Sequence, residues 1–379
     1  MKILVINCGS SSLKFELFES GKDLKSLAEG LVDRIGQKDC KLTFKGNKKN
    51  LGLKASSKNH TEALKLALET LQTKDIKKVG HRVVHGGEKY QKPVKIDAKV
   101  LKEIQKLAPL APLHNPVNIE GIKAAKKLLP KAKHIAVFDT AFHQTIPEKA
   151  YLYAIPRSLY EKNNIRRYGF HGTNHEYVTH KVLNKSTKKI ISIHLGNGSS
   201  ITASQNGEAI DTTMGFTPLE GLPMGTRSGT IDPAIVLEIQ KIKKFDRKKT
   251  DNYLNHKCGL LALSEISSDM RDIYEASLKG NKKALQTIEI LSYQIAKHVG
   301  ALAATLNGVD ALIFTGGLGE KAFYVRQQAC EYLSHLGVQL DKRKNKASEK
   351  IISSSKSKTK VYIIKADEEY QIAKHSQAR

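Results

Sequence analysis

The same short pattern opens the chain and returns near its midpoint. The first copy is residues 3–12 and the second is residues 190–200. Each copy is a short apolar run, then a polar residue, then a loop of glycine and serine. Gly9 and Gly196 hold equivalent places and lie 187 residues apart, close to half of the 379-residue chain. A repeat at this spacing predicts two halves that share one fold, and keeping the copies in register requires one extra residue in the second loop.

Strand-like and helix-like patterns alternate around the two copies. The apolar runs that predict strands are residues 78–84, 134–138, 310–314 and 360–364. The runs that predict helices are residues 61–71, 98–107, 117–128, 233–242 and 284–306. Alternation of this kind favours an α/β fold of mixed sheets covered by helices.

The length of the chain argues for two domains, because one compact core does not grow to this size. We expect an N-terminal domain of residues 1–150. The tail, residues 367–379, reads as a short helix that crosses back to this first domain. Residues 151–366 would then form the second domain.

The net charge of the chain is +26, from 63 lysine and arginine residues against 37 aspartate and glutamate residues. A basic face of this kind can bind nucleic acid. Only 11 of the 63 basic residues are arginine, however, and the chain has no tryptophan. Lysine-rich runs such as residues 123–133 also lack the interleaved aromatic side chains that stack on bases. The composition therefore favours a lysine-rich solvated surface and makes nucleic acid unlikely, with a polyanion partner as the alternative.

The sequence also indicates the compartment. No run reaches the ~18 uninterrupted apolar residues that a membrane helix needs, and the first residues read as a buried strand rather than a signal peptide. The cysteines are scattered and include no CxxC pair, which argues against a disulfide framework or a zinc site. They are Cys8, Cys40, Cys258 and Cys330. We therefore expect a cytoplasmic protein that is not attached to a membrane.

Glycine-rich loops follow several of the predicted strands. A strand that runs into Gly9 and three serines presents backbone amides and hydroxyls at one point, which is a cradle for an anion, and Lys14 lies just beyond. Residues 316–319, Gly-Gly-Leu-Gly, would let a nucleotide pack against backbone. Taken alone, either loop is equally explained as a plain hairpin or a tight turn. The GxGxxG and GxxxxGK[ST] spacings are missing, which disfavours dinucleotide-binding and P-loop folds.

Four further segments are unusually rich in charged side chains, histidine and glycine. They are residues 81–87, 138–143, 169–172 and 225–229. An ordinary solvated loop is the alternative for each, but the rigid forks of Arg82 and Arg227 could hold a carboxylate and stabilise a phosphoryl group in transfer. Asp139, at the end of a predicted strand, is placed to hold Mg²⁺. We interpret three histidines as ordinary polar residues: His114, His134 and His143.

Together these segments resemble the acetate kinase (acetokinase) family over essentially the whole chain. The most specific stretches are residues 7–14 and 80–88, and the supporting ones are residues 138–143, 169–173, 194–198, 215–221 and 225–229. The resemblance implies the fold of the actin, hexokinase and Hsp70 superfamily. That fold has two duplicated, ribonuclease H-like α/β domains with mixed sheets flanked by helices, and the nucleotide binds in the cleft between domains. The resemblance also implies a homodimer.

The matching motifs also imply roles for individual residues. Asp139, His171 and Arg227 would be catalytic, with His171 and Arg227 stabilising the transferring phosphoryl group. Arg82 would bind the acetate carboxylate, and the pocket for the methyl group would be lined by Val84, Leu113, Phe170 and Pro218. Mg²⁺, or Mn²⁺ in its place, would be held by Asn7 and Glu368. The residues expected to contact ATP, mostly in the second domain, are Lys14, His194, Leu195, Gly196, Asn197, Gly198, Asp269, Met270, Arg271, Gly317, Leu318, Gly319, Glu320 and Lys321.

Two positions depart from the family pattern. The nucleotide loop of the family usually continues Gly-Glu-Asn, and this chain has Lys321 in place of the asparagine. The acidic segment before the last helix commonly begins with threonine, and here Ala366 takes that place. Both departures lie at the nucleotide and metal end of the expected site, so they bear on nucleotide preference and metal affinity.

The chemistry of the acceptor simplifies the expected mechanism. A carboxylate with a pKa near ~4–5 is already ionised at neutral pH, so its attack on the γ-phosphorus needs no general base. We expect direct in-line transfer from Mg·ATP to acetate, giving acetyl phosphate and ADP in a reaction that runs in both directions. Asp139 would orient the metal rather than remove a proton.

Other functions remain as alternatives. A propionate kinase is the nearest, because one methylene changes the binding free energy by only ~1–3 kcal/mol, whereas a butyrate kinase would need a roomier pocket. A different class, an ATP-gated binding or filament protein, shares the expected fold. Such a protein has no need of two arginines and a histidine in glycine-rich loops.

Overall fold

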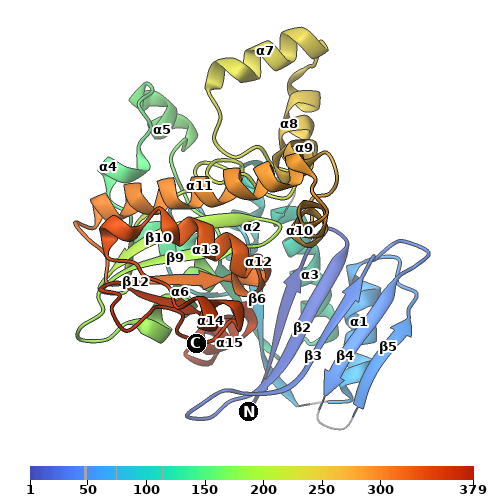
Figure 1. Cartoon of the computed structure of the whole chain (residues 1–379). Helices are drawn as coiled ribbons and strands as arrows, with labels where there is room; N and C mark the ends of the chain where they lie inside the picture. The colour runs from blue at the N-terminus through green and yellow to red at the C-terminus, as the bar shows by residue number, and fades with distance from the viewer. Residues whose placement is uncertain (47–48, 74, 113) are drawn as a thin grey trace. The chain divides into compact units, whose positions relative to one another are not determined.

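The chain folds into two compact units (Figure 1). The computed structural model describes residues 1–46, 49–73, 75–112 and 114–379, so Leu113, expected in the acetate pocket, lies outside the described residues. The first unit comprises Met1–Gln144 and Asp367–Arg379, and the second comprises Thr145–Ala366. The expected boundary lay after residue 150. The division falls earlier because the segment from Thr145 onward joins the second unit, where the Thr145 hydroxyl donates to the Ala209 carbonyl at 2.8 Å.

The first unit contains a mixed sheet with the strand order β5-β4-β3-β2-β1-β6-β8-β7. Strands β1 to β5 pair antiparallel in succession, whereas β1, β6 and β8 run parallel and β7 is antiparallel to β8. The strands are β1 (Lys2–Cys8), β2 (Ser12–Glu19), β3 (Lys25–Asp33), β4 (Lys41–Gly46), β5 (Lys49–Lys54), β6 (Ile76–Val83), β7 (Val94–Lys95) and β8 (Lys133–Phe138). The helices are α1 (His60–Leu71), α2 (Ala98–Lys106), α3 (Asn115–Leu128) and α15 (Glu368–Gln377), with short 3₁₀ turns at Ala108–Leu110 and Ala141–Thr145.

Strand β1 is buried on both faces, which explains its unbroken apolar run. Leu4 and Ile6 pack into a core shared with α1 and α3. Ile3 and Val5, which point to the opposite face, pack against Ile372 and the neighbouring alanine of α15. A strand covered by helices on both sides has no need of polar alternation. The last helix of the described chain therefore completes the core of the first unit.

The second unit repeats this arrangement with the strand order β11-β10-β9-β12-β13. Here β9, β10 and β11 pair antiparallel, and β9, β12 and β13 run parallel. The same order and directions occur in β3-β2-β1-β6-β8 of the first unit, so the duplicated α/β fold expected from the repeat is confirmed. The strands are β9 (Lys189–Leu195), β10 (Ser199–Gln205), β11 (Glu208–Thr212), β12 (Ala311–Thr315) and β13 (Lys360–Ile363).

Helices cover both faces of this second sheet. The long helix α11 (Lys282–Thr305) lies along one face, where Leu291, Ile295 and Val299 pack against β9 residues (Figure 1). Helix α6 (Gly172–Val182) packs its valines against Ile190 and Ile313 on the other face. The remaining helices are α4 (Glu148–Tyr151), α5 (Arg157–Asn163), α7 (Pro233–Lys243), α8 (Arg247–His256), α9 (Gly259–Ser264), α10 (Met270–Leu278), α12 (Gly316–Lys321), α13 (Phe323–Glu331) and α14 (Lys342–Lys346), with a 3₁₀ turn at Ser334–Leu336. Among the helices of the described residues we find none with the length and apolarity required to cross a membrane.

The two equivalent hairpin loops differ in length, and the expected difference was wrong in sign. In the first, Cys8 lies opposite Leu13 and the Gly9 amide donates to the Ser12 carbonyl at 2.9 Å. In the second, Leu195 lies opposite Ser199, and the turn contains only residues 196–198. The second loop is thus one residue shorter, not longer. Matching the serines by identity gave the wrong register because the ladder of strand hydrogen bonds, rather than residue identity, sets the turn.

Candidate active site

Three side chains of the first unit meet where parallel strands end. Asn7 lies near the end of β1, Arg82 near the end of β6, and Asp139 directly follows β8. The Arg82 guanidinium donates to the Asp139 carboxylate at 2.7 Å and to the Asn7 side-chain oxygen at 3.4 Å. Asp139 is only 1% exposed, so its negative charge is held inside the protein by Arg82. The carboxyl ends of neighbouring parallel strands share one edge of the sheet, and this edge gathers the three residues.

Helix α15 adds two carboxylates to the same cluster. Glu368 Oε2 lies 3.7 Å from Arg82 Nε, and Lys14 Nζ donates to Glu369 Oε2 at 2.6 Å. Burial alone would lower the pKa of Arg82, but Asp139 and Glu368 raise it above its ordinary value. Burial raises the pKa of Glu368 to about 7, although Arg82 acts in the opposite direction. The cluster holds more acidic than basic side chains, so it favours a further cation.

The segment after Arg82 is held rigidly by side chains of α3 and by the residue after Asp139. The Val84 amide donates to Asn118 Oδ1 at 3.0 Å, and the Gly86 amide donates to Thr140 Oγ1 at 3.1 Å. A Cβ atom on Gly86 would lie 2.8 Å from the Phe138 ring, so this close approach requires glycine. Val84 is therefore fixed as a buried apolar residue beside Arg82.

A second cluster of functional side chains lies in the second unit, around Gly198. A Cβ atom on Gly198 would lie 3.0 Å from His171 Nε2 and 3.4 Å from Arg227 Nη1, so both side chains converge on this loop. His171 precedes α6 with a positive φ of 57°, a strained conformation for a residue with a side chain. Its ring stacks on the His194 ring at 4.3 Å between centroids, and His171 Nδ1 is hydrogen-bonded to the Ser200 hydroxyl at 2.9 Å.

Arg227 differs from Arg82 in having no ion pair with any residue that the structure describes. Arg227 Nη1 donates to the Pro218 carbonyl at 3.3 Å and lies 3.7 Å from Met224 Sδ. Burial lowers the pKa of Arg227. A largely buried guanidinium without a carboxylate is costly to the fold. The second unit therefore keeps a positive charge in place that an incoming anion would compensate.

A cavity of about 670 Å³ lies in the second unit, next to this cluster. Gly196 and Asn197, from the loop that carries Gly198, form part of its wall. Tyr274 stacks on Tyr324 at 3.6 Å between ring centroids, which gives the cavity an aromatic side. The volume and the mixed polar and aromatic lining suit a nucleotide. The residues expected to contact ATP that line this cavity are Gly196, Asn197, Asp269, Met270, Arg271, Gly317, Leu318 and Lys321.

The other residues expected to contact ATP have different surroundings. Glu320 Oε1 accepts from the Ala366 amide at 2.9 Å, and the Gly319 carbonyl accepts from the buried Arg326 at 2.8 Å. Leu195 is fully buried in the core of the second unit. His194 and Gly198 lie in the cluster around His171, and Lys14 belongs to the first unit. Residues 316–321 form the short helix α12, so successive side chains point in different directions and only some of them line the cavity.

Comparison with known proteins decides the family. The acetokinase family model matches residues 2–374. The chain belongs to the acetokinase family. Acetate kinase of Thermotoga maritima is 50% identical over 394 residues, covering 99% of this chain and 97% of the relative. Acetate kinase of Thermoanaerobacterium thermosaccharolyticum is 49% identical, with 100% and 98% covered.

Solved structures give the same result. Acetate kinase of Porphyromonas gingivalis is 40% identical, with a TM-score of 0.93 and coverage of 100% of this chain and 99% of that chain. A propionate kinase from Francisella tularensis is 42% identical, with a TM-score of 0.94 and the same coverage. The resemblance seen in the sequence motifs and the expected fold class are both confirmed.

The two departures from the acetokinase pattern have distinct surroundings. Lys321, at the end of α12, lines the cavity of the second unit. Asp367, which follows Ala366, caps α15, since its side chain accepts from the Tyr370 amide at 3.0 Å. The first departure therefore adds a positive charge to the lining of this cavity, whereas the second lies directly before a residue that caps a helix.

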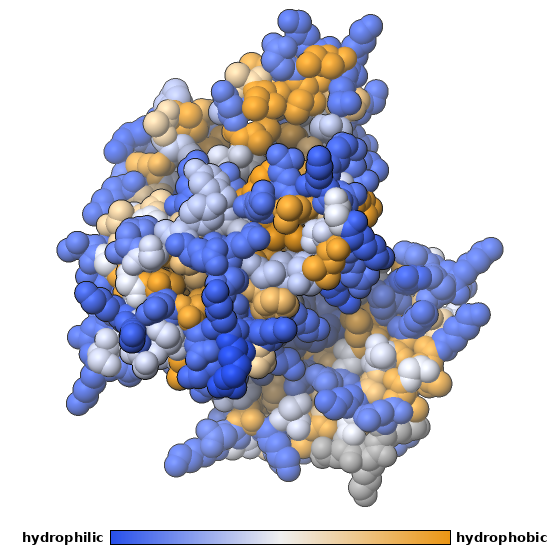
Figure 2. All heavy atoms as spheres, in the orientation of Figure 1, coloured by the Kyte–Doolittle hydropathy of each residue, from blue (hydrophilic) through white to orange (hydrophobic). Residues whose placement is uncertain are grey.

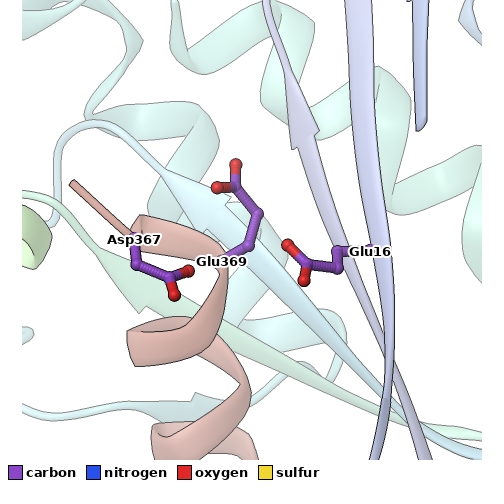
Figure 3. Close-up of side chains that lie close together, drawn as sticks. All are labelled: Glu16, Asp367 and Glu369. Atoms are coloured by element: carbon purple, nitrogen blue, oxygen red, sulfur yellow. The ribbon is translucent and has the colours of Figure 1, made fainter. Parts of the chain in front are cut away.

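One acidic group in this acetokinase was not anticipated from the sequence. Carboxylate oxygens of Glu16, Asp367 and Glu369 all lie within 4.8 Å of one another (Figure 3). Burial raises the pKa of Glu16 to about 7, with Asp367 and Glu369 acting in the same direction. Sequence reasoning missed Glu16 because it lies in β2, about 350 residues before α15. The available signal was a lone charged residue in the apolar part of β2, where Glu16 is buried.

Proposed function

We propose that the chain transfers the γ-phosphoryl group of ATP to acetate in an Mg²⁺-dependent and reversible reaction, giving acetyl phosphate and ADP. One observation carries this proposal: Arg227 and His171 converge on Gly198, and the neighbouring Gly196 and Asn197 line the cavity suited to a nucleotide. A phosphate chain that extends from the cavity along this loop would reach a guanidinium that has no carboxylate partner among the described residues.

The roles of the side chains follow from their charges. Arg227 and His171 would stabilise the charge on the phosphoryl group during transfer, and the backbone of the loop at Gly198 would let that group approach closely. Arg82, with its guanidinium held by Asp139, would bind the acetate carboxylate. The methyl group would lie against an apolar lining, for which Val84, Phe170 and Pro218 are the described candidates and Leu113 is the fourth. The adenosine would occupy the cavity of the second unit.

The first-unit cluster fits a divalent cation. The atoms in it that can coordinate a metal are carboxylate and amide oxygens, the hard type that Mg²⁺ prefers, and three carboxylates face two basic groups. Asn7 and Glu368 would hold the ion, and Asp139 would orient it through its ion pair with Arg82, which also donates to Asn7. Bound Mg²⁺ supplies charge neutralisation on the phosphate chain.

No general base is required for this reaction. Acetate is ionised at neutral pH, so the principal barrier is the approach of one anion to another. Positive side chains lower that barrier, and positioning in line supplies the rest. The product is a mixed anhydride whose phosphoryl group transfers as readily as that of ATP, so the same groups serve the reverse reaction.

Propionate is the second candidate acceptor. The structural neighbour from Francisella tularensis is a propionate kinase and has a TM-score of 0.94. One extra methylene in an apolar pocket is worth only ~1–3 kcal/mol, so a pocket for acetate admits propionate at reduced efficiency.

The test is a panel of acceptors. Purified protein is incubated with Mg·ATP and acetate, propionate or butyrate, and the acyl phosphate is trapped with hydroxylamine. We expect the highest kcat/KM with acetate, a lower value with propionate and a much lower value with butyrate. A protein that hydrolyses ATP but forms no acyl phosphate from any of the three would overturn the proposal.

We further propose that the enzyme is a homodimer in the cytoplasm. Helix α7 has no buried residue, and its Ile235, Leu237 and Ile242 are 46%, 66% and 75% exposed. Figure 2 shows the hydrophobic colouring of this helix at the top of the view. A second copy of the chain would cover this surface, as sedimentation of the wild type and of an Ile242→Asp variant can test.

The four cysteines are free thiols, which suits a reducing compartment.

A further inference from the structure

A carboxylate of the second unit that has been given no role so far is held on both of its oxygens. Tyr153 Oη donates to Glu220 Oε2 at 2.5 Å, and Arg167 Nη2 donates to Glu220 Oε1 at 2.8 Å. Glu220 belongs to the glycine-bounded loop of residues 215–221, which also contains Pro218. A carboxylate fixed by two donors from distant parts of the chain has one position and one orientation.

The same two donors also hold the backbone of the loop. The Phe216 amide donates to Tyr153 Oη at 2.9 Å, so the tyrosine hydroxyl joins the start of the loop to Glu220 near its end. Arg167 Nη1 donates to the Thr212 carbonyl at 3.0 Å, just before the loop. The packing at the base is tight, because a Cβ atom on Gly215 would lie 1.7 Å from Glu220 Oε2. The loop is therefore closed around the Glu220 carboxylate.

Arg227 also contacts this loop. The Pro218 carbonyl, two residues before Glu220, accepts from Arg227 Nη1 at 3.3 Å. The segments that carry the two residues are tied together again at Gly221, whose amide donates to Thr230 Oγ1 at 3.0 Å. Since Arg227 has no carboxylate partner in the described part of the chain, the Pro218 carbonyl is the oxygen that orients its guanidinium.

We propose that Glu220, held between Tyr153 and Arg167, is a positioning residue for phosphoryl transfer: it fixes the 215–221 loop so that the Pro218 carbonyl aims Arg227. This inference rests on the proposed function, which gives Arg227 its role in transfer. Glu220 need not touch either substrate. Its effect reaches the reaction through one backbone carbonyl and one guanidinium.

A displaced guanidinium changes some kinetic constants and leaves others intact. Misplacement of a transition-state contact by about 1 Å can lower the rate about 100-fold. ATP affinity depends on the cavity between α10, α12 and α13, none of which contacts Glu220 through any hydrogen bond described above. Loss of the Glu220 contacts should therefore lower kcat while KM for ATP stays nearly constant. A residue that only stabilised the fold would lower the fraction of folded protein. Its loss would reduce ATP binding and the rate together.

The test uses two substitutions of different severity and a matched control. Glu220→Ala removes the carboxylate, and Tyr153→Phe removes only the hydroxyl that donates to it. We expect kcat to fall ~30-fold in Glu220→Ala and ~3-fold in Tyr153→Phe, with KM for ATP within twofold of the wild type. The control is Glu148→Ala, which breaks the exposed Glu148–Arg157 ion pair of 3.0 Å in the same unit and should leave kcat unchanged. Equal losses of kcat and ATP affinity in Tyr153→Phe would overturn the proposal.

A double variant separates this proposal from the proposed function. If Glu220 acts through Arg227, the Glu220→Ala/Arg227→Ala protein should be no slower than Arg227→Ala alone. Independent, multiplicative losses in the double variant would refute the positioning role while leaving the role of Arg227 intact. A normal kcat in Arg227→Ala by itself would instead refute the proposed function, and the positioning role with it. Thermal unfolding and ATP titration of every variant establish that each protein is folded.

Discussion

The two units each present an arginine in a glycine-rich segment, and the two arginines have opposite surroundings. Arg82 of the first unit donates to Asp139 at 2.7 Å and lies near Glu368, and these carboxylates raise its pKa. Arg227 of the second unit contacts a carbonyl and a sulfur, and burial lowers its pKa. The first arginine has carboxylate neighbours before any ligand binds, whereas the second has none among the described residues. The charge of Arg82 is therefore balanced within the protein, and the charge of Arg227 is balanced only when an anion binds.

The largest effect that follows from this comparison concerns Arg227. Arg227→Ala should lower kcat about 10²–10³-fold, because the lost donor acts on charge that develops during transfer. KM for ATP should change far less, since the cavity residues remain. Steady-state kinetics with saturating acetate measure both constants, with Arg157→Ala as a surface control. Parallel losses of kcat and ATP affinity would contradict the assigned role.

The comparison makes a different prediction for stability. Arg82→Ala should reduce the free energy of unfolding by about 3 kcal/mol, because the buried Asp139 carboxylate loses the guanidinium that compensates its charge. Arg227→Ala should leave the free energy of unfolding unchanged or raise it, since it removes a largely buried charge that has no ion pair among the described residues. Denaturant titration of the two variants gives both values. Equal destabilisation by the two substitutions would mean that the arginines do not differ as described.

The surplus of carboxylates in the first unit predicts that activity depends on a divalent metal ion bound there. Chelation of Mg²⁺ should abolish acyl phosphate formation, and Glu368→Gln should raise the Mg²⁺ concentration for half-maximal activity about tenfold. Glu16→Gln serves as the comparison, because Glu16 belongs to the acidic group of Figure 3, which shares Glu369 with this cluster but does not include Glu368. A larger shift in the Glu16 variant than in the Glu368 variant would move the metal site to that group.

The smallest expected effect is the dependence of stability on pH. Burial lowers the pKa of His85 to about 3 and that of His143 to about 4, and it also lowers the pKa values of His81 and His134 in the same unit. Unfolding exposes these rings, which then bind protons below pH ~6.5. The unfolded state thus takes up more protons, so stability should be constant above that pH and fall as the pH drops toward 4. Each such histidine contributes up to about 1.4 kcal/mol per pH unit.

Replacing one of these histidines tests that account. His85→Gln should reduce the loss of unfolding midpoint between pH 7 and pH 5 by a few degrees, as ~1 kcal/mol corresponds to about 2–4 °C in a unit of this size. Replacement of the exposed His256 by Gln is the matched substitution outside the buried group. An unchanged pH dependence in the His85 variant would show that its proton uptake does not contribute.

Much of the fold was predictable because its determinants are local. The repeated pattern around Gly9 and Gly196 predicted the duplication, and the strand order of both sheets confirms it. Arg82 and Asp139 could be expected at one edge because each follows or ends a strand. The contacts of Glu16 and Glu220 could not be predicted in this way. Glu16 lies near residues of α15, hundreds of positions later in the sequence. Glu220 is bound by side chains that belong to none of its own motifs. The prediction that the second hairpin loop is longer was wrong for a related reason, because residue identity does not reveal the hydrogen-bond register of paired strands.

Strand β1 begins the described chain, and the helix that covers its Ile3 and Val5 is α15, which follows the whole second unit in sequence. During synthesis, one side of the first sheet therefore stays exposed to solvent until the ribosome has made the second unit. Glu368 and Glu369 arrive with that same helix. A chain interrupted anywhere in the second unit would thus lose both the helix that covers the core of the first unit and the carboxylates of Glu368 and Glu369.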